Sequence, residues 1–143
     1  MKIENITLEG VGLLLLSNKG RLLILEELEA KPLIQKEAGM LTFPLETVKT
    51  GESHERSLRR LLVEEVGIIE TEDFTQLGWF EFKHPQCEVK ILTYVAQVES
   101  EFIARPSDSD VAHKGWMSPT QLLDHHHKRL EVNPIIAAYL EGL

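Results

Sequence analysis

The fold is decided by residues 45–68, which read LETVKTGESHERSLRRLLVEEVGI. Ser53 is a suitable helix N-cap, apolar residues then recur at helical spacing, and Gly67 suits the left-handed conformation that ends many helices. The pattern predicts a helix over residues 53–66. Within this helix, Glu65 falls inside the apolar stripe that faces the core.

A carboxylate at the position of Glu65 needs a compensating charge. Burying an unpaired charge costs several kcal/mol even after the protein relaxes, so such a carboxylate requires a cationic side chain or a metal ion. Glu64 lies beside it at the edge of the stripe, and Glu52 stands just before the helix. Taken alone, the pair Glu64-Glu65 is also common at a solvated helix end. With Glu52, it forms an oxygen-rich group suited to Mg²⁺ or Mn²⁺, ions that also bind phosphate oxygens.

The spacing around these acids resembles the signature of the Nudix hydrolases, G-x5-E-x7-R-E-U-x-E-E-x-G-U, in which U is a bulky aliphatic residue. The residues that match it, without an insertion, are Glu52, Arg60, Leu62, Glu64, Glu65, Gly67 and Ile68. Gly51 stands at the usual helix entry of the family, and Trp116-Met117 resembles its late strand. The resemblance therefore spans nearly the whole chain.

Two positions depart from the signature. Glu46 stands where the signature has its first Gly, and Leu61 replaces the first Glu of the R-E-U triplet. In the family, that Glu acts with the two later ones to hold divalent cations, so its loss is expected to weaken metal binding and to remove a candidate base. The candidates for a replacement base are Asp108, Asp110 and His113.

The resemblance implies a divalent-metal-dependent hydrolase, using Mg²⁺ or Mn²⁺, that cleaves a diphosphate linkage in a nucleoside diphosphate-type substrate. It implies catalytic roles for Glu64, Glu65 and Glu52, the last through its charge or a water-mediated contact. Glu64 and Glu65 would ligate the metal, with the backbone carbonyl near Leu45 as an extra ligand. The structural residues of the motif are Arg60, which pairs with an acid, Gly51 and Gly67.

Leu61 also supports a function of a different class, a catalytically inactive Nudix-like module that binds a nucleotide or a protein. Divalent-dependent turnover separates the two hypotheses. Specificity in this family lies in loops, which here are residues 29–39 and 104–115, and the sequence does not identify the substrate. A homodimer whose contact surface completes the pocket is a further alternative.

Composition limits the broad class. The chain has 143 residues, one cysteine and a formal net charge of −8. No repeat or linker divides it, so a single Nudix-like domain over residues 1–143 is expected. The negative charge argues against binding to nucleic acid or to an anionic membrane surface. The most apolar run, residues 11–16, is far shorter than the ~20 residues that a membrane span requires, so we expect a soluble, cytoplasmic protein. The resemblance implies a small-molecule substrate.

The order of the remaining elements completes the prediction of the fold. Strands are expected at residues 6–17, 21–26, 40–43, 74–82 and 88–98, with a hairpin turn at residues 18–20. A polar loop is expected at residues 104–115, followed by helices at residues 118–129 and 133–140. This order indicates a mixed β-sheet between helices, which is the α/β/α Nudix fold that the resemblance implies.

Overall fold

The structure, a computed structural model, describes residues 6–67 and 73–142, so Ile68 of the matched signature lies outside the described residues. Within these ranges, seven strands form one mixed sheet with β1 (Ile6–Leu16) near its centre. β1 pairs in parallel with β6 and antiparallel with β2 and β4. The other strands are β2 (Leu22–Glu27), β3 (Leu41–Thr42), β4 (Leu45–Thr47), β5 (Thr75–His84), β6 (Cys87–Gln97) and β7 (Val111–Met117).

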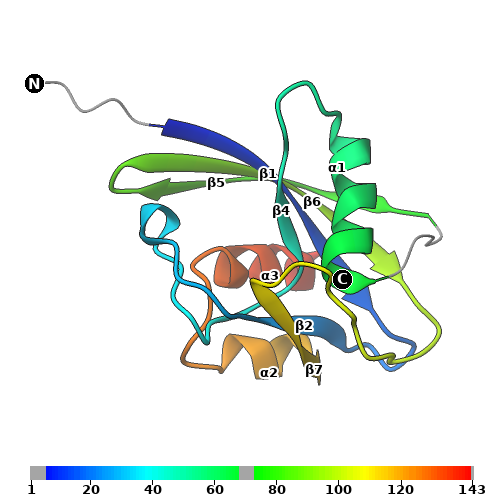
Figure 1. The fold of residues 1–143 in the computed structure, drawn as a ribbon. Coiled ribbons are helices and arrows are strands. Elements are labelled where there is room, and N and C mark those ends of the chain that lie inside the picture. Colours follow the sequence, from blue (N-terminus) through cyan, green and yellow to red (C-terminus); the bar gives the residue numbers. More distant parts are fainter. Residues whose placement is uncertain (1–5, 68–72, 143) are drawn as a thin grey trace, which may run out of the picture.

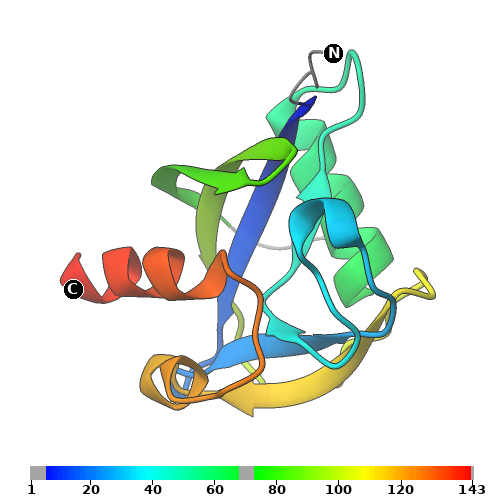
Figure 2. The same ribbon diagram turned by 90° about the vertical axis from the view of Figure 1, so that its left-hand side faces the viewer.

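Helices cover both faces of this sheet (Figures 1 and 2). Because successive side chains of a strand point to opposite faces, Leu13 and Leu15 of β1 pack with α1 (His54–Leu61), whereas Leu14 and Leu16 pack with α2 (Pro119–Leu123) and α3 (Val132–Glu141). The predicted α/β/α architecture is confirmed. None of the described helices is long and apolar enough to cross a membrane.

β1 has two different partners along one of its edges. The hairpin expected at residues 18–20 closes with the Ser17 amide donating to the Arg21 carbonyl, but β1 and β2 then pair only at Leu16 and Leu22. Farther along β1, residues 10–12 pair with β4, a strand that was not predicted. The sheet therefore places β4 beside the middle of β1, and β4 carries Glu46.

The helix predicted for residues 118–129 is wrong in its second half, because α2 ends at Leu123. The chain that follows joins the edge of the sheet instead. The Leu41 amide donates to the His127 carbonyl, and the Arg129 amide donates to the Leu41 carbonyl, at 2.9 and 3.0 Å. These bonds to β3 satisfy backbone groups that a longer helix would have satisfied internally.

The loop predicted for residues 104–115 is also shorter than expected. β7 begins at Val111 and pairs antiparallel with β2 over the whole length of that strand. Most of its residues are only half-buried, and its sequence lacks the alternation of apolar and polar residues from which a strand is predicted. The predicted last helix is present as α3.

The helix predicted for residues 53–66 is present, but its last turn is unusually wide. The Ser53 hydroxyl caps it by accepting from the Arg56 amide at 3.1 Å. α1 then continues into one turn of π-helix, η2 (Leu62–Val66), in which the Gly67 amide donates to the Leu62 carbonyl at 2.8 Å. Gly67 has φ +90°, which ends the helix.

The last carbonyl groups of this helix, which have no partner within the helix, accept hydrogen bonds from the loop that precedes β7. The Val66 carbonyl accepts from the Arg105 amide at 2.9 Å. The Glu64 carbonyl accepts from the amides of Ser107 and Asp108, at 2.8 and 3.2 Å. The end of the helix therefore holds Asp108 next to Glu64.

Replacing Gly67 tests this junction. An added Cβ would lie 2.7 Å from the Arg105 carbonyl oxygen, in a backbone conformation that side chains rarely adopt. We expect Gly67→Ala to lower the free energy of unfolding by more than about 1 kcal/mol, measured by urea unfolding. The matched control is Gly51→Ala, which has a similar φ of +80° but open space around its Cβ. Equal losses in the two variants would contradict the close contact with Arg105.

Candidate active site

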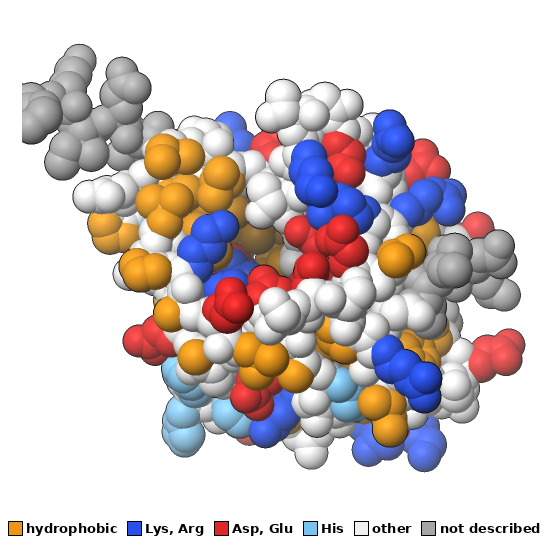
Figure 3. Space-filling view, in the orientation of Figure 1, with side chains coloured by type: hydrophobic (Ala, Val, Ile, Leu, Met, Phe, Trp, Pro, Cys, Tyr) orange, Lys and Arg blue, Asp and Glu red, His pale blue; other side chains and the backbone are white. Residues whose placement is uncertain are grey.

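An open cleft lies beside β1 and β4, and Figure 3 shows a hollow in this face with acidic side chains beside it and Lys or Arg side chains close by. Both segments that were expected to carry specificity, residues 29–39 and 104–115, contribute to its lining. The charged residues of the lining are Glu9, Glu27, Glu46, Glu65, Asp108, Asp110, Lys31, Lys36 and Arg129.

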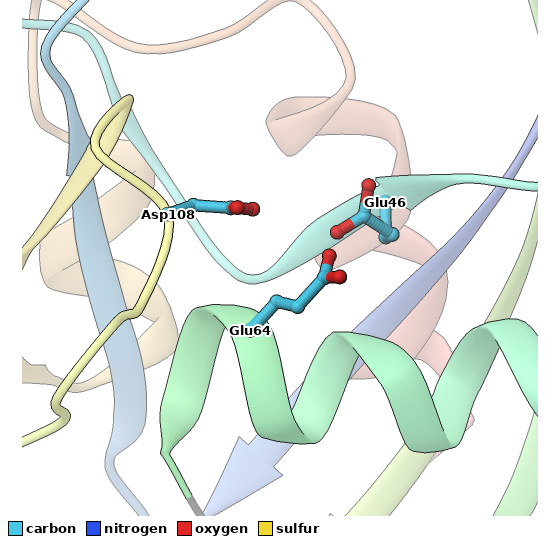
Figure 4. Close-up of side chains that lie close together, drawn as sticks. All are labelled: Glu46, Glu64 and Asp108. Carbon is cyan, nitrogen blue, oxygen red and sulfur yellow. The ribbon is translucent and has the colours of Figure 1, made fainter.

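Three carboxylates converge beside this cleft, and two of them, Glu46 and Asp108, line it. Glu46 comes from β4, Glu64 from η2, and Asp108 from the loop before β7 (Figure 4). One oxygen atom of each lies within 4.8 Å of the others. We call Glu46, Glu64 and Asp108 the carboxylate cluster. Carboxylate oxygens from separate segments that meet at such distances form a donor set suited to a hard divalent cation.

β4 reaches this position because two glycines of β1 let it approach closely. A Cβ on Gly10 would lie 3.1 Å from the Glu46 carbonyl oxygen, and one on Gly12 would lie 3.0 Å from the Leu45 side chain. Both contacts are tighter than most real Cβ contacts. The backbone at Gly10-Val11-Gly12 thus serves strand pairing and fixes the place of Glu46.

Arg60 forms the ion pair that was expected of it, and it does so with several acids at once. Its Nε and Nη2 atoms donate to the two carboxylate oxygens of Glu52, at 3.0 and 2.9 Å. Its Nη1 atom lies 3.1 Å from Glu64 and 3.2 Å from Glu46, and Nη2 also donates to the Thr47 carbonyl. One guanidinium therefore joins the helix to β4.

Glu52 is fully engaged in this arrangement. Besides Arg60, its Oε1 atom accepts from the Ser57 hydroxyl at 2.5 Å and from the Lys49 amide at 3.1 Å. The hydrogen bond from Arg60, followed by that from Ser57, holds the pKa of this carboxyl well below its usual range. Its oxygens are not part of the carboxylate cluster.

Glu65 is buried, as its place in the apolar stripe predicted, with only 5% of its surface exposed. Its Oε2 atom accepts from the Leu45 amide at 3.2 Å. Leu45 thus contacts Glu65 through its N–H group. Burial, reinforced by the negative charges of Glu46 and Glu27, raises the pKa of Glu65 well above its usual value.

The surroundings of Glu46 also disfavour the charged form of its carboxyl group. Burial raises its pKa to about 7, and the adjacent Glu64 adds to the shift, while Arg60 opposes it. The Oε2 atom of Glu46 is buried and has no hydrogen-bond partner among the described residues. A site whose neighbouring carboxylates resist simultaneous ionisation, and which holds an unpartnered buried oxygen, fits a divalent cation.

The three candidates for a replacement base lie in different places. Asp108 and Asp110 line the cleft, and Asp110 lies 3.9 Å from the Lys36 ammonium. Burial, and then the charge of Glu64, raises the pKa of Asp108. His113 is not among the lining residues, and its Nδ1 atom accepts from the Ala104 amide at 3.0 Å.

The cleft also contains cations that were not predicted from the sequence. Lys36 and Arg129 are about nine-tenths buried, and both lie near Glu27, at 3.5 and 3.3 Å. Lys36 lies within residues 29–39, the segment that was predicted to carry specificity, so the sequence pointed to its region but not to the residue. Arg129 was hidden by the helix wrongly predicted there. Cationic side chains in the cleft provide positive charge that can bind the phosphate groups of a ligand.

The Glu52–Arg60 pair predicts a pH dependence of stability. An acid whose pKa is depressed by folding stabilises the folded state above its unfolded pKa, here about 4.5, and loses that contribution as the pH falls. We expect Glu52→Gln to lower the melting temperature at pH 7 and the difference from wild type to shrink below pH 4.5. Glu55→Gln, at an exposed acid in the first turn of α1, is the control and should change little. A difference that persists undiminished at low pH would contradict the ion pair's role.

Comparisons with known proteins agree with this fold. The NUDIX domain family model matches residues 7–139. No curated protein matches the chain. Among solved structures, the chain is similar to the MutT protein of Methanosarcina mazei Go1, at 18% identity over 99% of this chain and 98% of that one, with a TM-score of 0.78.

Two further structures show the same fold. The MutT NUDIX hydrolase of Burkholderia pseudomallei has 21% identity over 92% of this chain and 97% of its own, with a TM-score of 0.75. The NUDIX domain of Shewanella oneidensis NrtR, solved with ADP ribose, has 17% identity over 99% and 90%, with a TM-score of 0.69. Since the family match covers nearly the entire sequence, the chain belongs to the NUDIX family.

Proposed function

We propose that this protein is a divalent-cation-dependent hydrolase that cleaves a diphosphate linkage in a nucleoside diphosphate-type compound. The observation that carries the proposal is the convergence of Glu46, Glu64 and Asp108, with Glu65 lining the same cleft, at the signature helix of a NUDIX domain. Glu64 and Glu65 hold the cation, Mg²⁺ or Mn²⁺. When bound, this ion neutralises negative charge on the bridging phosphate oxygens.

The chain's own residues bind and orient the rest of the substrate. Lys36 and Arg129 line the same cleft as Glu46 and Asp108 and are suited to phosphate oxygens that the cation leaves free. Apolar side chains of Leu8, Ile34 and Ile91 line the cleft as well and offer a surface to a less polar portion of the substrate. ADP ribose, which the NrtR domain binds, combines both features and belongs in the first set of test compounds.

Roles follow from the contacts of each acid. Glu52 acts through Arg60, which it orients toward Glu46 and Glu64. The proton of the attacking water is accepted by Asp108 or Asp110, the two replacement candidates that line the cleft. Separate substitution by Asn distinguishes them, because loss of the base lowers kcat even when Mn²⁺ is saturating.

A second candidate function is an inactive module that binds a nucleotide. The observation in its favour is Leu61, which is fully buried in the apolar core and supplies no carboxylate. Phosphate release from nucleoside triphosphates, ADP ribose, dinucleoside polyphosphates and nucleotide sugars, measured with Mg²⁺ or Mn²⁺ and with EDTA, separates the two. Turnover that EDTA abolishes supports the hydrolase. No phosphate release from any of these compounds, together with a ligand-induced rise in melting temperature, supports the binding module.

The roles of Glu64 and Glu65 give a direct prediction. Glu64→Gln and Glu65→Gln remove one negative charge each and keep the shape of the side chain. We expect both to abolish EDTA-sensitive turnover while the circular dichroism spectrum stays native. The control is Glu81→Gln, at a largely exposed acid on β5 outside the cleft, which should turn over substrate at the wild-type rate. Wild-type rates in both cleft variants would refute the proposed function.

A further inference from the structure

Two departures from the NUDIX signature concern the same chemical group. Position 61 lacks the carboxylate that the signature places there, and position 46 carries a carboxylate where the signature has a glycine. Separately, each weakens the match. Together they leave the number of acidic residues in the motif unchanged, which raises the question of whether the second compensates for the first.

Leu61 cannot serve the cluster in this fold. Its side chain is fully buried and belongs to the apolar core formed with Leu58 and Leu62. The π turn that follows it carries Glu64, whose carboxylate lies close to those of Glu46 and Asp108. The helix alone therefore contributes Glu64 and the buried Glu65, and a further ligand must come from another segment.

Glu46 is the side chain that reaches this place. The register of β4 sets Glu46 opposite Val11, and the close approach of the backbone at Gly10 holds the strand there. A carboxylate oxygen of Glu46 lies within 4.8 Å of oxygens of Glu64 and Asp108. Figure 4 shows the side chain directed from β4 toward that of Glu64.

The charges around Glu46 are not balanced by protein groups. Arg60 contacts only its Oε1 atom, at 3.2 Å, and Arg60 is shared with Glu52 and Glu64. The Oε2 atom is buried and lacks a hydrogen-bond partner in the described part of the chain. Leaving a buried carboxylate oxygen without a partner is costly. A cation bound by the cluster satisfies it.

We propose that Glu46 supplies from β4 the carboxylate that the signature places at position 61, and that it completes a divalent-cation site with Glu64 and Asp108. The inference rests on the proposed function, because it names a ligand of the same site. According to this proposal, the carboxylate ligand that the signature places at position 61 on the helix is provided in this chain by position 46 on β4.

Equilibrium titration with Mn²⁺ alone, followed by the electron paramagnetic resonance signal of the free ion, tests this proposal without substrate. We expect Glu46→Gln and Glu46→Gly each to weaken Mn²⁺ binding by at least about tenfold. Glu81→Gln should bind Mn²⁺ as wild type does. Thermal melts in EDTA establish that the variants fold, and the glycine variant, which restores the signature residue, carries the test if the glutamine variant does not fold.

A purely structural role for Glu46 gives a different result. The amide oxygen introduced by Glu46→Gln would still accept a hydrogen bond from Arg60, so this variant would retain Mn²⁺ affinity if Glu46 only anchored that side chain. Wild-type affinity in this variant, together with loss of binding in Glu64→Gln, overturns the inference and leaves the proposed function standing. Failure of the wild-type protein to bind Mn²⁺ overturns both.

Discussion

The side chain of Arg60 joins the parts of the site that repel one another. It contacts Glu52 at the start of the helix, Glu64 near its end, and Glu46 and the Thr47 carbonyl on β4. Without this guanidinium, the carboxylates would face each other across the junction of helix and strand. Since one positive charge serves three acids, the site keeps an excess of negative charge. That excess is the electrostatic basis for binding a divalent cation.

The wide π turn at the end of the helix serves the same site through the backbone. π turns are rare, and they often occur at functional positions. Here the carbonyls of Glu64 and Val66, which lie in this last turn, accept from the backbone of the loop that carries Asp108. Glu64 thus contributes its side chain to the cluster, and its backbone carbonyl also holds Asp108 in place. The geometry of one helix end fixes two of its three carboxylates.

Some of these features could be predicted from local patterns in the sequence. The helix at residues 53–66 and the burial of Glu65 follow from the spacing of the apolar residues. The pairing of Arg60 with an acid was implied by the resemblance to the NUDIX signature. The pairing of β4 with β1 did not follow, because the register of a three-residue strand is set by partners distant in the sequence. Glu46 consequently looked like a defect of the motif. Likewise, Arg129 could not be placed while residues 124–129 were assigned to a helix.

The central claim is that the carboxylate cluster binds a divalent cation. A crystal structure of the wild-type protein grown with Mn²⁺, with data collected at the manganese absorption edge, tests it most directly. The account predicts an anomalous peak in contact with carboxylate oxygens of Glu46 and Glu64 and on the side of the cleft that holds Asp108. A well-ordered cluster without such a peak, or manganese bound only elsewhere on the protein, would contradict it.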